Sequence, residues 1–242
     1  MIAGLKLRKD LVSIEPKIST FLPLKGGLVV SCQVPDGTAA DTPEFIAAQA
    51  RTVIQAGAVG IRAQGLDNVR AVAKVTNVPI IGLVKRYSPS TPVFITPAIK
   101  DVLELEAAGA SIVAIDATDR FRSDGVGLKN FLTQLRLETQ IPLLADVDSF
   151  EAGVIAEALG CESVATTLSG YTDVGAGPLP NIELLKRLAG KLHVPLIAEG
   201  GYSKPEHLKL ALDAGAWSVC IGTAITNPFQ LTKNFLEVLN QA

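Results

Sequence analysis

The chain has little of the residues that supply metal ligands, disulfides and aromatic cores. Its 242 residues include two histidines, three cysteines and one tryptophan, and aromatic residues make up 5% of the whole. A core with so few rings must be filled by Val, Ile, Leu and Ala, which suits a parallel sheet covered by helices. His193 precedes a predicted strand and His207 lies in a predicted outer helix, so neither is placed for a metal site in a barrel mouth. We therefore expect no bound metal.

An excess of one charge is also lacking. Lys and Arg total 22 against 24 for Asp and Glu, and the charges are not clustered. Such a chain builds no cationic surface for nucleic acid. Its apolar runs fall short of the roughly 20 residues of a membrane span, and residues 1–10 do not resemble a secretory signal. We expect neither nucleic acid nor a membrane as a partner.

The three cysteines, Cys32, Cys161 and Cys220, each lie in an apolar run typical of a strand. A buried free thiol in such a run behaves as a small hydrophobic group. We therefore expect reduced thiols and a cytoplasmic location.

The length of 242 residues is close to the roughly 250 residues of one (β/α)8 barrel. Residues 1–25 contain Pro16 and Pro23, which interrupt any helix, and we treat them as an N-terminal extension. Residues 26–242 are then one barrel domain.

Two short patterns alternate along the chain and predict its fold. In the first, a glycine ends a helix just before an apolar run, because glycine adopts the left-handed conformation without penalty. In the second, a proline follows an aliphatic residue and opens an apolar run, a position that a strand tolerates. The glycines are Gly57, Gly109, Gly160 and Gly215, and the prolines are Pro79, Pro142 and Pro195.

Together with the opening run at Leu28, these patterns predict eight strands separated by helix-length segments. The runs are almost continuously apolar, as strands buried on both faces are. Strict alternation gives the α/β class, and eight repeats without a Gly-x-Gly-x-x-Gly turn after the first strand favour a single (β/α)8 TIM barrel over an open sheet. The predicted strands are 28–33, 58–62, 79–84, 112–116, 142–146, 163–167, 195–199 and 218–222.

Polar side chains gather at the carboxyl ends of the predicted strands, where barrels of this class carry their active sites. Charged side chains are almost never buried without a partner, so a ring of them is not a product of core packing. A salt bridge that closes the barrel mouth is the structural alternative for any single carboxylate. The candidate substrate-binding residues are Gln33, Arg62, Gln64, Asp116, Thr118, Asp146, Thr167, Ser169 and Gly170.

Lys85 and Glu199 are the candidates for catalysis. Beside Arg62 and Arg86, the Lys85 ammonium would be disfavoured by like charge and desolvation, which lowers its pKa toward that of a usable base. Lys85 also suits a Schiff base, or simple binding of a phosphate or carboxylate. Glu199 ends the predicted seventh strand, so we expect that it can face Lys85 across the barrel mouth. An amine and a carboxylate on two sides of one carbon suit removal and return of a proton.

The loops after the seventh and eighth predicted strands are rich in glycine, and barrels commonly hold a phosphate there. Glycine lets the backbone approach closely, and exposed N–H groups favour an anion. Tight turns are the structural alternative for these glycines. The candidate phosphate-binding residues are Gly200, Gly201, Gly222 and Thr223.

From about Gly26 to its end, the chain resembles the N-acylglucosamine-6-phosphate 2-epimerases, also called N-acetylmannosamine-6-phosphate 2-epimerases. The matching segments follow in order and at compatible spacing, and the run Thr-Thr-Leu-Ser-Gly-Tyr-Thr is highly specific. The segments are Gly27–Gln33, Ile61–Gly65, Ile80–Arg86, Ile95–Pro97, Ala114–Arg120, Thr166–Thr172 and Ala198–Gly200.

The resemblance implies interconversion of N-acetylmannosamine 6-phosphate and N-acetylglucosamine 6-phosphate, a cytosolic step in the use of sialic acid. It implies no redox cofactor and no required metal. Lys85 would move the proton at C2, with Glu199 as its acidic or basic counterpart. Gln33, Arg62 and Asp116 would hold the sugar and its N-acetyl arm.

Two positions depart from the family pattern. Gly201 and Asn227 stand where the family usually has arginines, both next to the expected phosphate site. Two cations that the resemblance implies are therefore missing, and Lys204 is a candidate to replace one of them.

Epimerisation at C2 requires an open-chain aldehyde, because only a C–H bond next to a carbonyl is readily broken. We expect Lys85 to deprotonate C2 while donors such as Arg62 steady the enolate. One rival function is a Schiff-base aldolase or synthase on a related phosphosugar, and another is a non-catalytic phosphosugar-binding protein. The partner in each case is a small phosphosugar. The sequence leaves the assembly open, a homodimer included.

Overall fold

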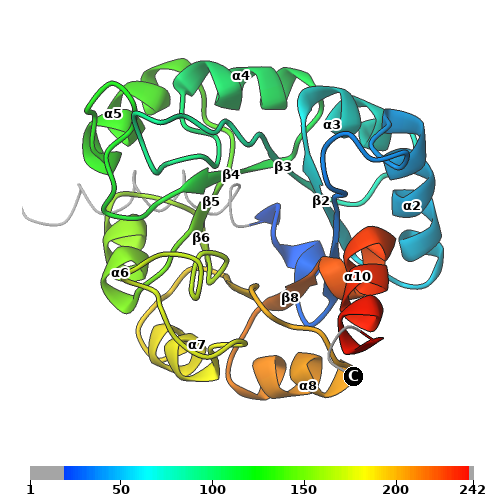
Figure 1. The fold of residues 1–242 in the computed structure, drawn as a ribbon. Helices are drawn as coiled ribbons and strands as arrows, with labels where there is room; N and C mark the ends of the chain where they lie inside the picture. The colour runs from blue at the N-terminus through cyan, green and yellow to red at the C-terminus, as the bar shows by residue number, and fades with distance from the viewer. Residues whose placement is uncertain (1–18, 240–242) are drawn as a thin grey trace, which may run out of the picture.

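Eight parallel strands close into a barrel in the computed structural model, which describes residues 19–239 (Figure 1). Each strand pairs with its neighbours in chain order, and β8 pairs with β1 to close the ring. The (β/α)8 barrel predicted from the sequence is confirmed. The strands are β1 (Leu28–Cys32), β2 (Gly60–Gln64), β3 (Ile80–Leu83), β4 (Ile112–Asp116), β5 (Leu143–Asp146), β6 (Ser163–Ala165), β7 (Leu196–Ala198) and β8 (Ser218–Ile221).

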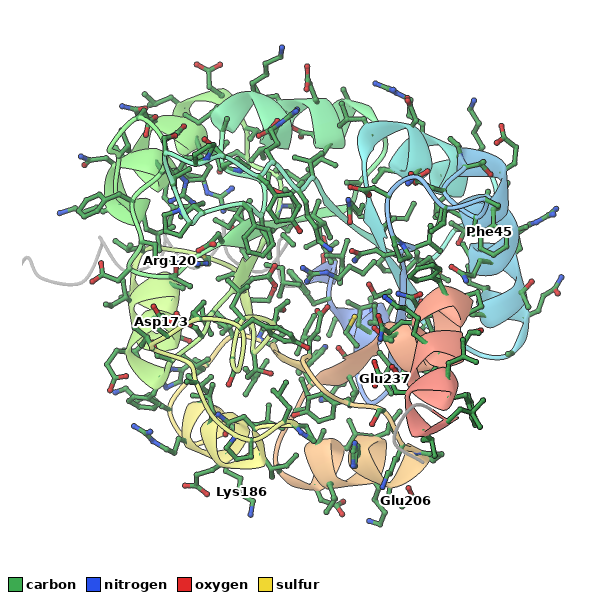
Figure 2. All side chains as sticks on the ribbon, in the orientation of Figure 1. Phe45, Arg120, Asp173, Lys186, Glu206 and Glu237 are labelled. Atoms are coloured by element: carbon green, nitrogen blue, oxygen red, sulfur yellow. The ribbon has the colours of Figure 1, made fainter. Side chains whose placement is uncertain are left out.

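Helices alternate with the strands and surround the barrel (Figure 1). Their charged side chains, such as Lys186 and Glu206, project away from the sheet into solvent (Figure 2). Within the described range, every helix is too short or too polar to cross a membrane. The helices are η1 (Leu22–Leu24), α2 (Pro43–Gln55), α3 (Leu66–Ala73), α4 (Ile99–Ala107), α5 (Leu128–Glu138), α6 (Phe150–Ala158), α7 (Ile182–Ala189), α8 (Pro205–Asp213), α9 (Thr223–Thr226) and α10 (Pro228–Leu239).

Four helices end in the same way before the even-numbered strands. The predicted stop glycines all have positive φ, at 106° for Gly57, 102° for Gly109, 89° for Gly160 and 99° for Gly215. The N–H of the residue after each glycine donates to a carbonyl five residues back, for example Ala58 to Val53 at 3.0 Å. This is the Schellman motif, so the predicted glycine stops are confirmed.

The predicted prolines stand directly before β3, β5 and β7, which begin one residue later than predicted. Proline has no N–H to donate to a ladder, but its carbonyl can accept. The carbonyls of Pro79, Pro142 and Pro195 accept from the N–H groups of Ile61, Val113 and Val164 at 3.0 to 3.1 Å. The carbonyl of each proline thus makes the first hydrogen bond between the strand that follows it and the preceding strand.

Strand β2 lies two residues further along the chain than predicted. The prediction of 58–62 placed Arg62 at the strand end, whereas β2 spans Gly60–Gln64 and Arg62 lies in its middle. The helix-ending turn accounts for the shift, because the N–H of Ala58 still closes α2. Arg62 therefore sits deeper in the barrel than the sequence indicated.

Residues 19–25, the described part of the predicted N-terminal extension, close the bottom of the barrel. Phe21 and Leu24 are fully buried in the same apolar cluster as the inward-facing Val29, Ile81 and Ile112. In Figure 1 this short blue segment lies within the ring of strands. The indole N–H of Trp217, just before β8, donates to the carbonyl of Phe21 at 2.8 Å. Residues 1–18 of the predicted extension lie outside the described residues.

Candidate active site

Alternation along the strands brings polar side chains into the upper half of the barrel. Successive residues of a strand point to opposite faces, so every second residue faces the interior. On β3 and beyond, Ile81 and Leu83 fill the lower interior and Lys85 follows above them. The same period carries Ile197 below Glu199 on the β7 side. The apolar lower layers thus support a polar upper layer.

A cavity of about 680 Å³ opens at the carboxyl ends of the strands. Its size suits a small organic ligand, because pockets for such ligands typically measure roughly 300 to 1,000 Å³. Ten of the fifteen residues predicted for the site line it. They are Gln33, Arg62, Gln64, Lys85, Thr167, Glu199, Gly200, Gly201, Gly222 and Thr223.

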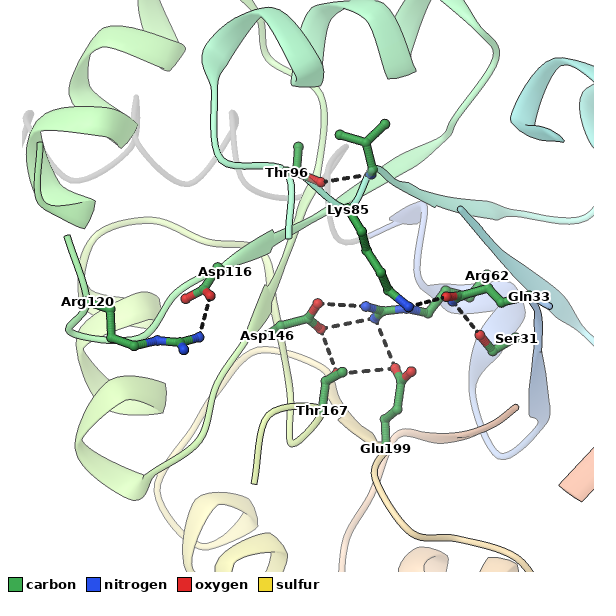
Figure 3. A network of polar contacts seen from close by, with 11 residues as sticks. Ser31, Gln33, Arg62, Lys85, Thr96, Asp116, Arg120, Asp146, Thr167 and Glu199 are labelled. Atoms are coloured by element: carbon green, nitrogen blue, oxygen red, sulfur yellow. Dashed lines mark hydrogen bonds and ion pairs between the residues drawn. The ribbon is translucent and has the colours of Figure 1, made fainter. Parts of the chain in front are cut away.

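The guanidinium of Arg62 organises the floor of this cavity (Figure 3). Its two terminal nitrogens bind both oxygens of Asp146, at 3.0 and 2.6 Å, and Nη1 also donates to Glu199 at 2.9 Å. The hydroxyl of Thr167 reaches Asp146 at 2.6 Å and Glu199 at 3.2 Å. Arg62 and Asp146 are almost fully buried, whereas the Glu199 side chain is 14% exposed. The Glu199 carboxylate therefore reaches the cavity while Arg62 and Thr167 hold it in position from beneath.

Burial and charge act in opposite directions on Arg62 and Glu199. Burial alone would lower the pKa of Arg62, but Asp146 and Glu199 outweigh it, so its pKa is raised and it stays cationic. The pKa of Glu199 is raised by burial, against the opposing effect of Arg62. A carboxyl whose pKa is raised holds a proton more readily than an ordinary glutamate, which suits an acid or base.

Lys85 points into the cavity beside Arg62 (Figure 3). Its Nζ donates to Oε1 of Gln33 at 2.8 Å, and Nε2 of Gln33 donates to Ser31 at 2.7 Å, which fixes the amide orientation. Burial lowers the pKa of Lys85, and Arg62 lowers it further, while Glu199 and Asp36 oppose the shift. Lys85 thus releases its proton more easily than an ordinary lysine.

Arg86 does not share this environment with Lys85, contrary to the sequence prediction. Its Nε donates to Asp101 of α4 at 2.6 Å, and its side chain is 53% exposed. Consecutive residues of an extended segment point to opposite sides, so Arg86 faces the helix layer when Lys85 faces the interior. Arg62, rather than Arg86, is the like charge beside Lys85.

Five of the residues predicted for substrate binding do not line the cavity. Asp146 lies beneath Arg62, as described above. Asp116 is fully buried, and its carboxylate binds the side chains of Thr118 at 2.6 Å and Arg120 at 2.7 Å, apart from the Arg62 network (Figure 3). Ser169 and Gly170 belong to the loop after β6, where Ser169 accepts from Asn181 at 2.9 Å.

The cavity wall also includes residues that were not predicted as a site. Phe94, Leu168 and Tyr171 bring apolar surface, and Asn227 and Asn234 bring amides from the segment after β8. The loop residues lacked a signal because each lies past the predicted strand ends. The run Thr166–Thr172 did mark Leu168 and Tyr171 as part of a specific motif, although it gave them no role.

The loops after β7 and β8 present backbone donors at one end of the cavity. Gly200 and Gly201 have φ of 104° and 75°, conformations that favour glycine. Within residues 19–239, the N–H groups of Gly200, Gly201, Thr223 and Ala224 donate to no other residue. Free N–H groups around a concave surface are the usual setting for an anion.

The two departures from the family pattern have structural counterparts. A side-chain Cβ at Gly201 would lie 2.4 Å from Cβ of Leu179, so the loop after β6 occupies the space of a longer residue. Asn227 caps α10, because its Oδ1 accepts from the N–H of Gln230 at 2.9 Å. Lys204 stands at the start of α8, exposed and away from the cavity lining. Lys85 and Arg62 are thus the cations of the described cavity wall.

The three cysteines are free and buried, as predicted. Cys220 lines the cavity next to Glu199, and burial raises its thiol pKa well above the ordinary value. Such a thiol stays protonated. In the part of the chain that the structure describes, no three His, Cys, Asp or Glu side chains cluster as metal ligands do.

Comparison with known families gives a single, consistent result. A family model described as "Putative N-acetylmannosamine-6-phosphate epimerase" matches residues 46–241. Two relatives are named "Putative N-acetylmannosamine-6-phosphate 2-epimerase". The one from Caldanaerobacter subterraneus subsp. tengcongensis is 40% identical over 221 residues, covering 90% of this chain and 93% of its own. The one from Thermosynechococcus vestitus is 43% identical over 204 residues, covering 84% and 89%.

Solved structures agree with the sequence comparison. The N-acetylmannosamine-6-phosphate 2-epimerase from Clostridium perfringens superposes with a TM-score of 0.82 at 38% identity, covering 89% of this chain and 94% of its own. A thiamine phosphate pyrophosphorylase from Pyrococcus furiosus superposes with a TM-score of 0.60 at 15% identity, over 88% and 93% of the two chains. The second likeness concerns the fold alone.

Proposed function

Because this chain belongs to the N-acetylmannosamine-6-phosphate epimerase family, we propose that it interconverts N-acetylmannosamine 6-phosphate and N-acetylglucosamine 6-phosphate in the cavity above Arg62. The observation that carries the proposal is the meeting of Lys85, Arg62 and Glu199 at one cavity wall. The hydrogen at C2 becomes removable once the sugar ring opens to the aldehyde.

Lys85 is the base of the proposed reaction. Its lowered pKa increases the share of neutral amine, and an amine needs its free lone pair to take the C2 proton. Gln33 accepts one N–H of Lys85, which leaves the lone pair to point elsewhere. Gln33 thus orients the base without competing for its function.

Arg62 stabilises the enolate that forms when the proton leaves C2. A guanidinium has five N–H groups, and the contacts to Asp146 and Glu199 use three of them, so Nη2 keeps one to donate to substrate. Because Arg62 is held in place before substrate arrives, its charge needs no rearrangement during the reaction. The negative charge that develops on the aldehyde oxygen then meets a fixed cation.

Glu199 has two roles compatible with its position. In one, its carboxyl, with its raised pKa, returns a proton to the opposite face of C2. In the other, it moves a proton during ring opening, and Lys85 returns the proton to the opposite face of C2 after the open-chain enolate has turned that face toward it. A Glu199→Gln variant distinguishes the two, since loss of ring opening alone is rescued by a substrate that is already open.

The Schiff-base and non-catalytic functions are not favoured, because the matching family model and the similar proteins described above that are at least 38% identical are all epimerases by name. We propose that the free N–H groups after β7 and β8 bind the phosphate. The side-chain amides of Asn227 and Asn234 would donate to it in place of the arginines that the family usually has. No cofactor enters this scheme.

Buried free thiols suit a reducing compartment such as the cytoplasm.

Turnover in heavy water tests the mechanism. The product should carry deuterium at C2, because the removed proton exchanges with solvent before return. Lys85→Ala should lose at least a hundredfold in kcat, in line with the roughly 10² to 10⁴ that a positioned base contributes. Unlabelled product from the wild type, or full activity of Lys85→Ala, contradicts the scheme.

We also propose that the chain forms a homodimer through α10. None of the α10 side chains is buried, and Phe235, Val238 and Leu239 are about 70% exposed or more. Apolar side chains gathered on one helix mark an interaction site. Leu231 and Asn234 of the same helix line the cavity, so pairing at α10 would also steady the cavity wall.

Light scattering tests the assembly. The wild type should have twice the chain mass, and Phe235→Glu should shift it toward the monomer. Leu210→Glu on α8, where the side chain is 52% exposed, adds the same single charge and should leave the mass unchanged. A monomeric wild type contradicts the dimer and leaves the epimerase proposal untouched.

A further inference from the structure

The segment Val93–Thr96, between β3 and α4, folds back along the residues that carry Lys85. Lys85 and Ile95 form an antiparallel bridge. The N–H of Thr96 donates to Val84 at 2.8 Å, and the N–H of Arg86 donates to Phe94 at 2.9 Å. The backbone on both sides of Lys85 is therefore held by this one segment.

The barrel itself does not hold Lys85 in this way. The ladder between β3 and β4 ends at the pairs Ile81 with Ile112 and Gly82 with Val113. Above these pairs the returning segment stands between the strands, and the N–H of Asp116 donates to the carbonyl of Ile95 at 3.1 Å. The position of Lys85 thus depends on a loop more than on the sheet.

Thr96 has an unusual backbone within this segment. Its φ is 44°, and among residues 19–239 it is the one residue other than glycine with positive φ. A β-branched residue in this conformation is strained, because its Cβ approaches the backbone. Glycine would take the same conformation freely, so the presence of threonine indicates that its side chain serves a purpose.

The Thr96 side chain completes a two-way contact with Val84. Its Oγ1 accepts from the N–H of Val84 at 3.3 Å, while its own N–H donates to the carbonyl of Val84 (Figure 3). Thr96 is fully buried and Val84 is 6% exposed, so water does not readily replace this hydroxyl. A buried N–H without an acceptor is costly, which keeps the hydroxyl and the peptide together.

We propose that Thr96 is a positioning residue that fixes the peptide before Lys85 and so aims Nζ at Gln33 and the cavity. The proposal rests on the proposed function of Lys85 as the base. A base must lie within hydrogen-bond distance of the proton that it removes, and small misplacements are costly. Thr96 would act through this distance without touching substrate.

Three substitutions test the role. Thr96→Val keeps the shape and removes the acceptor, Thr96→Ser keeps the acceptor, and Thr96→Gly removes the acceptor together with the strain. We expect kcat to fall roughly tenfold to a hundredfold in the Val and Gly variants, with KM within about twofold, and to recover in the Ser variant. The acid limb of the pH profile should move to higher pH in the Val variant, because a looser Lys85 is better solvated.

Thr91 offers a matched control in the same loop. It is also a buried threonine whose Oγ1 accepts from a backbone N–H, but that N–H belongs to Val93, at 3.1 Å, and not to a residue next to Lys85. Thr91→Val should change thermal stability without moving the pH profile. All activities are normalised to the folded fraction measured by circular dichroism.

An unchanged kcat and pH profile in Thr96→Val would overturn the inference, as would a Ser variant as impaired as the Val variant. Lys85→Ala separates this from the proposed function. If Lys85→Ala is inactive and Thr96→Val is normal, the positioning role alone fails. If Lys85→Ala is active, the base is wrongly assigned and the inference falls with it.

Discussion

Single residues carry the site, and Asp146 is a clear case of a residue that acts from outside the cavity. Its two oxygens bind Arg62, and both side chains are almost fully buried. Removing one partner of a buried ion pair leaves the other uncompensated, which is far more costly than losing a surface pair. The pair therefore determines both the stability of the barrel core and the placement of the cation.

Asp146→Asn should lower the free energy of unfolding by about 3 kcal/mol, since Arg62 keeps Glu199 but loses its bidentate partner. Urea unfolding measures the change. Asp148→Asn is the control, because Asp148 is also a buried carboxylate but binds the hydroxyl of Thr172 instead of an arginine. Equal losses in the two variants would show that the Arg62 pair has no special weight.

Asp36 offers a test of the electrostatics of Lys85 outside the catalytic network. Its carboxylate opposes the lowering of the Lys85 pKa, so Asp36→Asn should lower that pKa further. Activity that requires the neutral amine rises with pH through this pKa. The acid limb of kcat/KM should therefore move to lower pH in the variant.

Asp41→Asn is the matched control for this shift, since Asp41 is exposed in the same loop and is not among the charges that affect Lys85. Its pH profile should coincide with that of the wild type. A shift to higher pH in Asp36→Asn would contradict the assigned cause.

The sequence predicted which side chains line the cavity better than it predicted the hydrogen bonds between them. Position at the carboxyl ends of the predicted strands was enough to bring Gln33, Arg62, Lys85 and Glu199 to one cavity. It did not predict that Asp116 would bind Thr118 and Arg120, because a carboxylate at a strand end has the same pattern whether it binds substrate or a neighbour. It also missed Thr96, whose strain depends on a loop conformation that no periodic pattern encodes.

At the level of elements, local signals explain how much of the fold was predictable. Stop glycines and opening prolines mark one end of seven strands, and all eight strands were located. Their upper ends were predicted less accurately, since β6 ends at Ala165 and β7 at Ala198, two residues and one residue earlier than predicted. Strand β2 was displaced because the turn after Gly57 takes two more residues than expected.

The segment around the short helix η1 contributes to stability by packing Phe21 into the barrel interior. Phe21 is fully buried inside the barrel, whereas Leu22 next to it is 55% exposed. Phe21→Ala should cost about 3 to 5 kcal/mol in unfolding free energy, as large-to-small changes in a core do. Leu22→Ala should cost less than about 1 kcal/mol, and thermal or urea unfolding compares the two. Similar losses would mean that the segment does not pack as described.

For the whole molecule, the barrel places an apolar layer below and the polar residues of the candidate site above along its axis. The lower interior is apolar and supplied by short aliphatic residues, while the upper interior is polar and connected by hydrogen bonds. This arrangement agrees with the few aromatic residues of the chain, since layers of branched side chains fill a barrel of this size. Substitutions below should alter melting alone, whereas substitutions above, such as Asp146→Asn, should alter turnover as well as melting.

The buried Phe21 and Leu24 also affect how substrate enters the cavity and how product leaves it. Among residues 19–239, the chain fills the base of the barrel with these side chains, and the cavity opens at the carboxyl ends of the strands. Substrate and product must therefore pass through the same opening, so the product has to leave before the next substrate molecule can enter.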